Sequence, residues 1–557
     1  MFTETFNIIV ISYGGPGNQM NPFVENNFSC LFPMLKKLAL PLTFVALVGV
    51  SGTSVGQTAA NPDSALQEIL QGLEGSPLSL HDAVRAALQN ATSVRSAEAA
   101  YLAARGAVRR ERGLFDPELF LSLNHLDQES PTASFFAGAP ILITKQTTGS
   151  AGIRWDLPTG TELEASLSTV RLESNSQFAF LNPQYTAFGT LNLRQPLLGG
   201  FLATGSKDLS KAEKDLESQK ARYDQEVLAT SAETERSYWD LYAGKRNYAV
   251  QKLTRDRAEA FLKETETRAR GGLVGPDEVA NARTFLAEQQ LLLLDREEQA
   301  DRISDNLSSL MGMRPANGVY IPVNDPPYDF PIVPVDSLIA RAFRGNLELS
   351  AAGEEVEGSR VLARAAGWSA LPQIDLVGSL GGSGLAGTAQ DVIFGSDTLR
   401  STRGGTFGDA VSQATKRDFP TWSIGVEISI PIGFRNGLGE QDRLEAEVMS
   451  AEQRRIAVSR GLEDQVRSSY RELVHGRRRL EAAREGVDAA QEQVRIGLIE
   501  FQNGRSTAFE LVRLGADFAL SQLRYSEALV RTAKAAATLN QLTSGGYPGS
   551  MQNEETR

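Results

Sequence analysis

Two long stretches of the first half have the residue pattern of α-helices. Residues 207–270 contain no proline and a single glycine, Gly244, and they are rich in Ala, Glu, Lys, Leu and Gln, which favour helix. A glycine-rich break at 271–276 separates them from a second helical stretch at 277–311. At 1.5 Å per residue, this pattern predicts a helix, or two helices end to end, of about 100 Å and a shorter return helix.

The second half repeats this hairpin pattern. Residues 440–500 form one helical stretch, 502–506 break it, and 507–542 return. In both hairpins apolar residues recur every seven positions, which places them on one stripe of an under-wound helix and predicts coiled-coil packing. The recurring positions are Val279, Leu286, Leu293, Ala300 and Leu307, then Val466, Leu473, Leu480, Val487, Val494 and Phe501, and finally Leu511, Phe518, Tyr525, Thr532 and Leu539.

Shorter segments outside the helices alternate apolar and polar residues, as β-strands do. Residues 185–195 and 422–430 show this alternation, and 152–169 predict a hairpin with its turn at Pro-Thr-Gly. The alternation fits a half-buried soluble sheet as well as a barrel wall between lipid and water. Trp422 is accordingly either an interfacial anchor or a core residue. The Gly-, Ser- and Thr-rich segment 381–416 predicts an external loop.

The order of two short helices, a break and a strand occurs twice. The first copy has Asn90 between its helices and Pro117 before its strand, and the second has Asn346 and Pro372 in these places. The two asparagines are separated by nearly the same interval as the two prolines, which predicts an internal two-fold repeat. The repeats are predicted at 78–312 and 334–545, each with short helices, strands and a long helical hairpin.

An export signal precedes the repeats. Two lysines follow Met34, an apolar stretch covers 38–50, and small residues at 54–56, or later at Ala59 and Ala60, suit a signal peptidase. The apolar stretch is shorter than the roughly 20 residues of a membrane-spanning helix. We therefore expect an upstream segment at 1–33 that precedes the true start codon, a signal peptide at 34–60 and a disordered tail at 546–557.

The composition and charge of the chain argue against several classes of function. The net charge of −12 argues against nucleic-acid binding, because phosphate neutralisation requires excess Lys and Arg. Cys30, the single cysteine, precedes the predicted signal peptide, so the mature chain would hold no disulfide. Three scattered histidines offer no metal cluster, and nucleophile elbows, phosphate loops and dinucleotide fingerprints are absent from the sequence. The chain is predicted to have no enzymatic activity, cofactor or metal.

The signal peptide, the repeated order of elements and the glycine-centred hairpin turns together resemble the TolC-like outer membrane efflux protein family. The likeness extends from about Leu78 to Gly545, and its most specific parts are the turns at 272–283 and 501–511. The resemblance implies an α+β membrane protein: a homotrimer with four strands per subunit in a closed 12-stranded β-barrel, continued by an α-helical coiled-coil tunnel. It implies the outer membrane of a Gram-negative-type bacterium, with the helices in the periplasm.

The resemblance also implies a function and partners. The trimer would be the outer-membrane channel of a tripartite efflux or type I secretion system, passively conducting substrates from a periplasmic adaptor and inner-membrane pump to the exterior. The tip residues expected to contact the adaptor are Gly272, Leu273, Val274, Gly504, Arg505 and Ser506. The alternative is that the tip glycines only allow each helix to reverse direction.

Family members narrow the periplasmic end of the tunnel with a Tyr, an Arg and Asp residues. The matching positions here are Phe501, Ser506 and Glu278. Phe501 lacks the hydroxyl group and Ser506 the guanidinium group, so the family's hydrogen-bonded latch does not carry over intact. Of two further acids that ring the inside of the tunnel, Glu510 matches one and Arg513 replaces the other.

Two roles remain open for Glu510. In a trimer it would form a ring of three carboxylates, which favours cations in a narrow pore. Alternatively, it forms an ordinary pair with Arg513 one turn away. Arg505 and Arg513 are both candidates to pair with Glu278 or Glu510.

A different class of function also fits part of the sequence. An exported coiled-coil scaffold or adhesin without channel activity would explain the signal peptide and the heptads. It would not explain alternating strands at matching points of two repeats.

Overall fold

The computed structural model describes residues 62–201, 204–316, 318–394, 397–401, 404–503 and 505–547. They lie within one compact unit, Ala60–Arg557. The predicted upstream segment at 1–33, the signal peptide at 34–60 and the tail from residue 548 onward lie outside the described residues.

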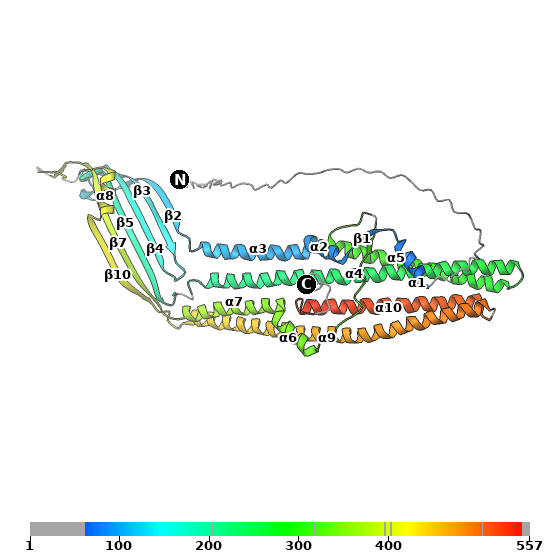
Figure 1. The fold of residues 1–557 in the computed structure, drawn as a ribbon. Helices are drawn as coiled ribbons and strands as arrows, with labels where there is room; N and C mark the ends of the chain where they lie inside the picture. The colour runs from blue at the N-terminus through cyan, green and yellow to red at the C-terminus, as the bar shows by residue number, and fades with distance from the viewer. Residues whose placement is uncertain are drawn as a thin grey trace, which may run out of the picture. The chain divides into compact units, whose positions relative to one another are not determined.

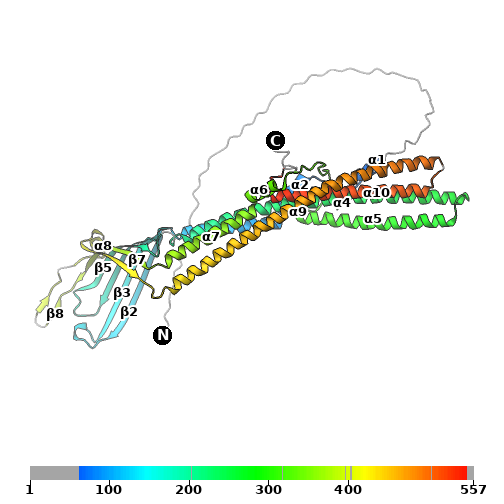
Figure 2. The same ribbon diagram turned by 90° about the horizontal axis from the view of Figure 1, so that it is seen from below.

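The two predicted hairpins form as four long helices. They are α4 (Lys207–Arg270), α5 (Pro276–Met311), α9 (Arg435–Gln502) and α10 (Ala508–Leu542). α4 and α9 are continuous helices of 64 and 68 residues, so each is about 100 Å long. The hairpins lie side by side, with α10 packed against α4, and both turns lie at the end far from the sheet (Figures 1 and 2).

The heptad residues form much of the core between these helices. Leu307, Val466, Leu473 and Leu539 are fully buried, whereas heptad positions nearer the turns are only partly buried. The surroundings of Gly244 show why a glycine occurs within α4. A Cβ atom at this position would lie 3.2 Å from the Ile303 side chain of α5. The glycine therefore lets α4 and α5 approach closely.

Short helices occupy equivalent places in the two halves. They are α2 (Leu80–Asn90) and α3 (Thr92–Gly113) in the first half, and α6 (Val335–Gly345) and α7 (Leu347–Ser369) in the second, with α1 (Pro62–Gln71) before them. The Asn90 side chain donates a hydrogen bond to the Met311 carbonyl (3.1 Å), and Asn346 donates to the Leu542 carbonyl (3.4 Å). Each asparagine thus satisfies a carbonyl at the end of its own hairpin.

The Tyr238 side chain of α4 connects the helical core to the two chain segments that pass over α4. Two short parallel strands, β1 (Ser76–Leu78) and β6 (Tyr320–Pro322), lie over α4. The fully buried Tyr238 hydroxyl donates to the Leu78 carbonyl (3.0 Å) and accepts from the backbone N–H groups of Val323 (3.1 Å) and Asn324 (3.0 Å). Burial raises the pKa of this phenol, so it stays a neutral donor.

One six-stranded antiparallel sheet lies at the other end of the helices (Figure 1). Its spatial order is β10-β7-β5-β4-β3-β2. The strands are β2 (Glu118–Pro131), β3 (Ile141–Asp156), β4 (Glu162–Ser174), β5 (Leu181–Leu198), β7 (Gln373–Ala389) and β10 (Phe419–Ser429). Between them lie a 3-10 turn at Phe135–Ala137 and a small hairpin of β8 (Val392–Phe394) and β9 (Asp397–Leu399).

The sheet contains six strands, two more than the four per subunit predicted for the barrel. The additional strands are β3 and β4, the predicted hairpin at 152–169, which pair with β2 and β5 along their length. The loop expected at 381–416 is wrong in part. β7 continues to Ala389, and 407–416 form the helix α8 (Phe407–Lys416). Small residues that suggested a loop instead make room for this helix.

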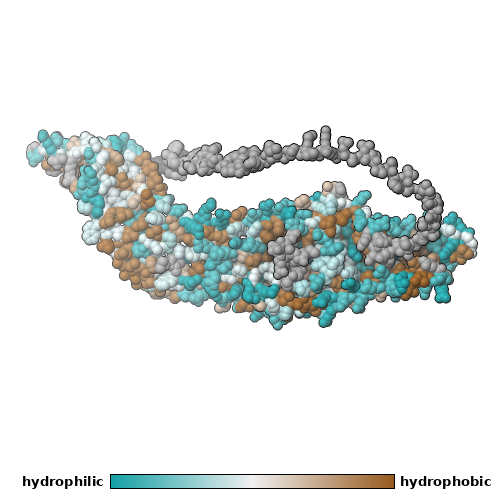
Figure 3. Space-filling view, viewed as in Figure 1, coloured by the Kyte–Doolittle hydropathy of each residue, from teal (hydrophilic) through white to brown (hydrophobic). Residues whose placement is uncertain are grey.

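The sheet has one apolar and one polar face. Residues paired across an antiparallel sheet point to the same side, so each cross-strand row belongs to one face. One row reads Leu119, Ile153, Ala165, Leu191, Leu380 and Trp422, and the next row on the opposite face reads Glu118, Arg154, Glu164, Asn192, Ser379 and Ser423. Most of the apolar side chains are exposed in the single chain, and Figure 3 shows hydrophobic residues gathered over the sheet.

Helix α8 covers the apolar face near the ends of β5 and β7 far from the long helices. Its Ala410 and Ala414 are buried against Ala187 and Ala386. A Cβ atom built on Gly384 of β7 would overlap the carbonyl oxygen of Ala410. The helix can therefore approach the sheet only because this position is glycine.

A Gly384→Leu substitution is therefore expected to detach α8 from the sheet, at a cost of about 1–3 kcal/mol of packing. Limited proteolysis within 390–418 checks this, and cleavage should become markedly faster. Gly378→Ala is the matched control, because its Cβ would meet only the Ser423 carbonyl at 3.8 Å, an ordinary contact. Unchanged proteolysis of the leucine variant would show that α8 does not depend on this close approach.

Candidate functional site

The first hairpin turn is built by two glycines and a proline. Gly272 has a φ of +72°, a conformation that glycine adopts without strain. It lets the Leu273 N–H turn back to the Arg268 carbonyl (3.0 Å), which ends α4. Pro276 then occupies the first turn of α5, where its fixed φ suits a helix start.

The second turn uses different chemistry. The Arg505 N–H bonds to the Glu500 carbonyl (2.9 Å), and the Thr507 hydroxyl caps α10 by accepting from the Glu510 N–H (3.2 Å). Gly504, a predicted tip residue, lies outside the described residues.

The described tip residues are accessible. The Leu273 side chain is 77% exposed, Gly272 and Arg505 are exposed, and Val274 and Ser506 are partly buried. The structure thus brings both turns to the same end of the molecule (Figure 2).

Phe501 lies in an apolar cluster that joins all four long helices near the tips. Phe261 of α4 and Ala282 of α5 are buried there, and Leu262, Phe501 and Val512 pack against them. The Arg268 guanidinium lies 5.5 Å from the centre of the Phe501 ring, a cation–π distance. Phe501 therefore takes part in apolar packing between the two hairpins.

The charged residues predicted at the gate are not paired within the single chain. Glu278, Arg505 and Arg513 are exposed and Glu510 is partly buried. Across the part of the chain that the structure describes, no ion pair links Glu510 to Arg513, nor either arginine to Glu278. Both predicted roles of Glu510, a carboxylate ring in a trimer and a pair with Arg513, stay predictions.

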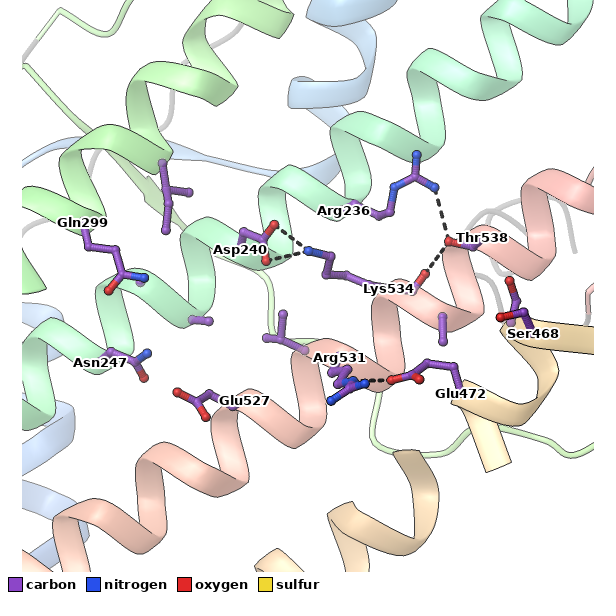
Figure 4. Close-up of a pocket in the computed structure, with 16 residues that line it drawn as sticks. Arg236, Asp240, Asn247, Gln299, Ser468, Glu472, Glu527, Arg531, Lys534 and Thr538 are labelled. Atoms are coloured by element: carbon purple, nitrogen blue, oxygen red, sulfur yellow. Dashed lines mark hydrogen bonds and ion pairs between the residues drawn. The ribbon is translucent and has the colours of Figure 1, made fainter. Parts of the chain in front are cut away.

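A charged pocket of about 500 Å³ lies between the two hairpins, closer to the hydrophobic core than the turns are (Figure 4). Lys534 of α10 donates to both carboxylate oxygens of Asp240 on α4 (2.7 and 2.9 Å). Arg236 of α4 donates to the Thr538 hydroxyl of α10 (3.2 Å). These contacts link the first half of the chain to the second.

On the other side of this pocket, an ion pair connects α10 to α9. The Arg531 guanidinium donates to the Glu472 carboxylate and holds the pKa of that carboxyl below its ordinary value. A lowered pKa means that the pair stabilises the fold above the ordinary pKa of a glutamate, and that this contribution is lost as the pH falls through the lowered value. Sequence reasoning missed this pocket, because its partners lie about 60 to 300 residues apart in the chain, as with Glu472 and Arg531.

Neither a candidate metal cluster nor a helix able to span a membrane occurs among the described residues. None of their His, Cys, Asp and Glu residues form a group that could hold a metal ion. Among these same residues, every helix is too short or too polar to cross a bilayer.

The comparisons with known proteins agree with this geometry. Residues 83–313 and 338–545 match the family described as outer membrane efflux protein. These two segments cover well over half of the chain, so the chain belongs to this family. Members are transport proteins, so the expectation that the chain is not an enzyme is confirmed.

Solved structures with a similar fold are outer membrane channels. The Campylobacter jejuni CmeC outer membrane channel has a TM-score of 0.60 at 13% identity, over 86% of this chain and 88% of that chain. VceC from Vibrio cholerae, an outer membrane protein, gives 0.57 at 15% identity, over 84% and 96%. The Neisseria gonorrhoeae MtrE outer membrane channel, in its open state, gives 0.56 at 15% identity, over 84% and 89%. No curated protein sequence gives a match.

Proposed function

We propose that three copies of this chain form an outer-membrane channel that passively conducts substrates from a periplasmic adaptor and inner-membrane pump to the exterior. The sheet would form the barrel wall, and the helices would form a periplasmic tunnel. The observation that carries the proposal is the two-faced sheet at one end of two hairpins of about 100 Å.

The sheet supports a membrane location. Its apolar rows continue across all six strands, and Leu121, Trp422 and Ile424 are 83%, 69% and 70% exposed. A soluble protein rarely leaves so large an apolar face open to water. Facing lipid, these side chains would be in their preferred medium, with the polar face toward a water-filled lumen.

Exposed apolar residues on the long helices support assembly. Leu291 and Leu294 of α5 are 65% and 61% exposed, and Ile496 and Ile499 of α9 are both 45% exposed. These side chains lack a partner surface within the described part of one chain. Contact between neighbouring subunits along the tunnel would bury them.

Single-channel conductance in a planar bilayer tests the proposal. The purified full chain should run as an oligomer and insert to give discrete current steps. A water-soluble native protein without conductance would instead support the exported coiled-coil scaffold or adhesin. The adaptor would dock on the turns through Gly272, Leu273, Val274, Gly504, Arg505 and Ser506.

Glu510 offers a test of the gate within that channel. Three unpaired Glu510 carboxylates around a narrow pore would attract cations and bind trivalent cations. Glu510→Gln is expected to reduce cation selectivity and to weaken block by a trivalent cation about tenfold or more, measured as reversal potential and blocking concentration. Glu288→Gln is the matched control, because Glu288 is an exposed glutamate of α5 outside the predicted gate residues. Unchanged selectivity and block in Glu510→Gln would remove this residue from the pore.

A further inference from the structure

The two outer strands of the sheet leave backbone edges without a partner strand in the described part of the chain. β2 forms one edge and β10 the other, and each is paired on a single side. Long strand edges of this kind tend to pair with another chain. Because the sheet has an even number of antiparallel strands, β10 of one copy meets β2 of the next in the antiparallel direction.

The strands do not end at the same level on the side of the helices. Glu118, the first residue of β2, lies in the same cross-strand row as Ser423 of β10. β10 continues past that row, from Ser423 to Ser429, before it leads into α9. The sheet therefore steps by six residues between its two edges, as tilted strands in a barrel wall do.

We infer that each subunit contributes all six strands, and that three copies close an 18-stranded barrel in which Glu118 of one copy lies opposite Ser429 of the next. This inference rests on the proposed trimeric channel and deepens it. In this register all 11 residues of β10 face residues 118–128 of β2, so the shorter strand is fully paired. Without the six-residue step, only residues 419–423 of β10 would have partners.

The junction between β10 of one copy and β2 of the next is called the seam below. In the same register, the apolar and polar faces of the sheet continue across this seam. A shift of six residues is even, so apolar side chains stay on the apolar face. The apolar pairs become Leu119 with Ile428, Leu121 with Val426 and Leu123 with Ile424, and all six side chains are more than half exposed in the single chain. On the polar face, Asn124 comes opposite Ser423.

The geometry of closure is consistent with known barrels. Three steps of six residues give a shear of 18, equal to the strand number. Equal shear and strand number correspond to a tilt of about 36°, within the range of membrane barrels. With strands about 4.8 Å apart, the backbone diameter is about 34 Å, wider than a 12-stranded barrel of the same tilt. The turns at the far end of the helices, and not the barrel, would then limit passage.

Cysteine cross-linking in native outer membranes tests this seam, in the full chain with Cys30→Ser as background. Asn124→Cys with Ser423→Cys should give mainly covalent trimers on a non-reducing gel after mild oxidation. A bond within one subunit is excluded because the two edges are about 24 Å apart across the sheet, and a disulfide needs Cα atoms within about 7 Å. Gln128→Cys with Ser423→Cys is the matched control, on the same face but four residues out of register, and should stay uncross-linked.

A second pair tests a 12-stranded barrel in which β2 and β3 lie outside the wall. β10 would then meet the edge of β4, and Ser168→Cys with Ser423→Cys would cross-link. That result, or cross-linking of the Gln128 control in place of Asn124, would overturn the 18-stranded seam and leave the channel intact. Absence of all cross-links in a conducting trimer would overturn the seam as well. A monomer without conductance would overturn the proposed function itself.

Discussion

Replacing Tyr238 with phenylalanine is expected to lower the stability of the helical core by about 1–3 kcal/mol. The substitution keeps the buried ring and removes only the hydroxyl. The Asn324 N–H group then loses its partner, whereas the Val323 N–H still donates to the Leu78 carbonyl (3.1 Å). Buried polar groups left unpaired cost about 1–3 kcal/mol each when water cannot reach them. Proteolysis of the crossing segment at 313–334 and the temperature at which the oligomer dissociates measure the loss.

Tyr223→Phe is the matched control for this prediction. Tyr223 also lies on α4, but it is only partly buried, and its ring stacks on Tyr101 at 6.1 Å between centroids. The control should behave like the parent chain. Equal proteolysis rates for the two variants would mean that the Tyr238 hydroxyl does not hold β1 and the segment after β6 on α4.

Replacing Phe501 with alanine is expected to open the tips of the proposed channel. The ring packs in the cluster with Phe261 and Ala282, and its loss removes about 2 kcal/mol of contact between the hairpins. If this cluster holds the closed state, a change of about 1.4 kcal/mol already raises the open population tenfold. Conductance at low voltage, measured without adaptor, should rise by at least that factor.

Leu273→Ala separates this effect from a general change at the tips. Leu273 is 77% exposed and makes little contact within the chain, so its loss should leave conductance unchanged while weakening binding of the adaptor. A Phe501→Ala channel with parental conductance and an intact trimer would show that the apolar cluster is structural only.

The sequence predicted the long helices and the turns well, because these depend on local patterns. The stretch without proline and the glycine-rich break at 271–276 determine where α4 ends and α5 begins, whatever lies beside them. The glycines at Gly271 and Gly272 and the sequence at 502–506 likewise predicted where the two hairpins turn. The role of Glu510 stays a prediction, because it depends on neighbouring side chains that a local pattern does not specify.

Other features depend on residues far apart in the chain, and only the tertiary structure decided them. Period-two alternation marks 152–169 as strands, yet it cannot say whether they join the sheet, because the pairing partners on β2 and β5 are separate segments. The glycines in β7 predicted a loop from the sequence. Only the structure shows that α8 packs on them. The sequence by itself predicted two strand-and-hairpin halves and determined the extent of the long helices. The tertiary structure decided that six strands share one two-faced sheet, because strand pairing and close packing are non-local.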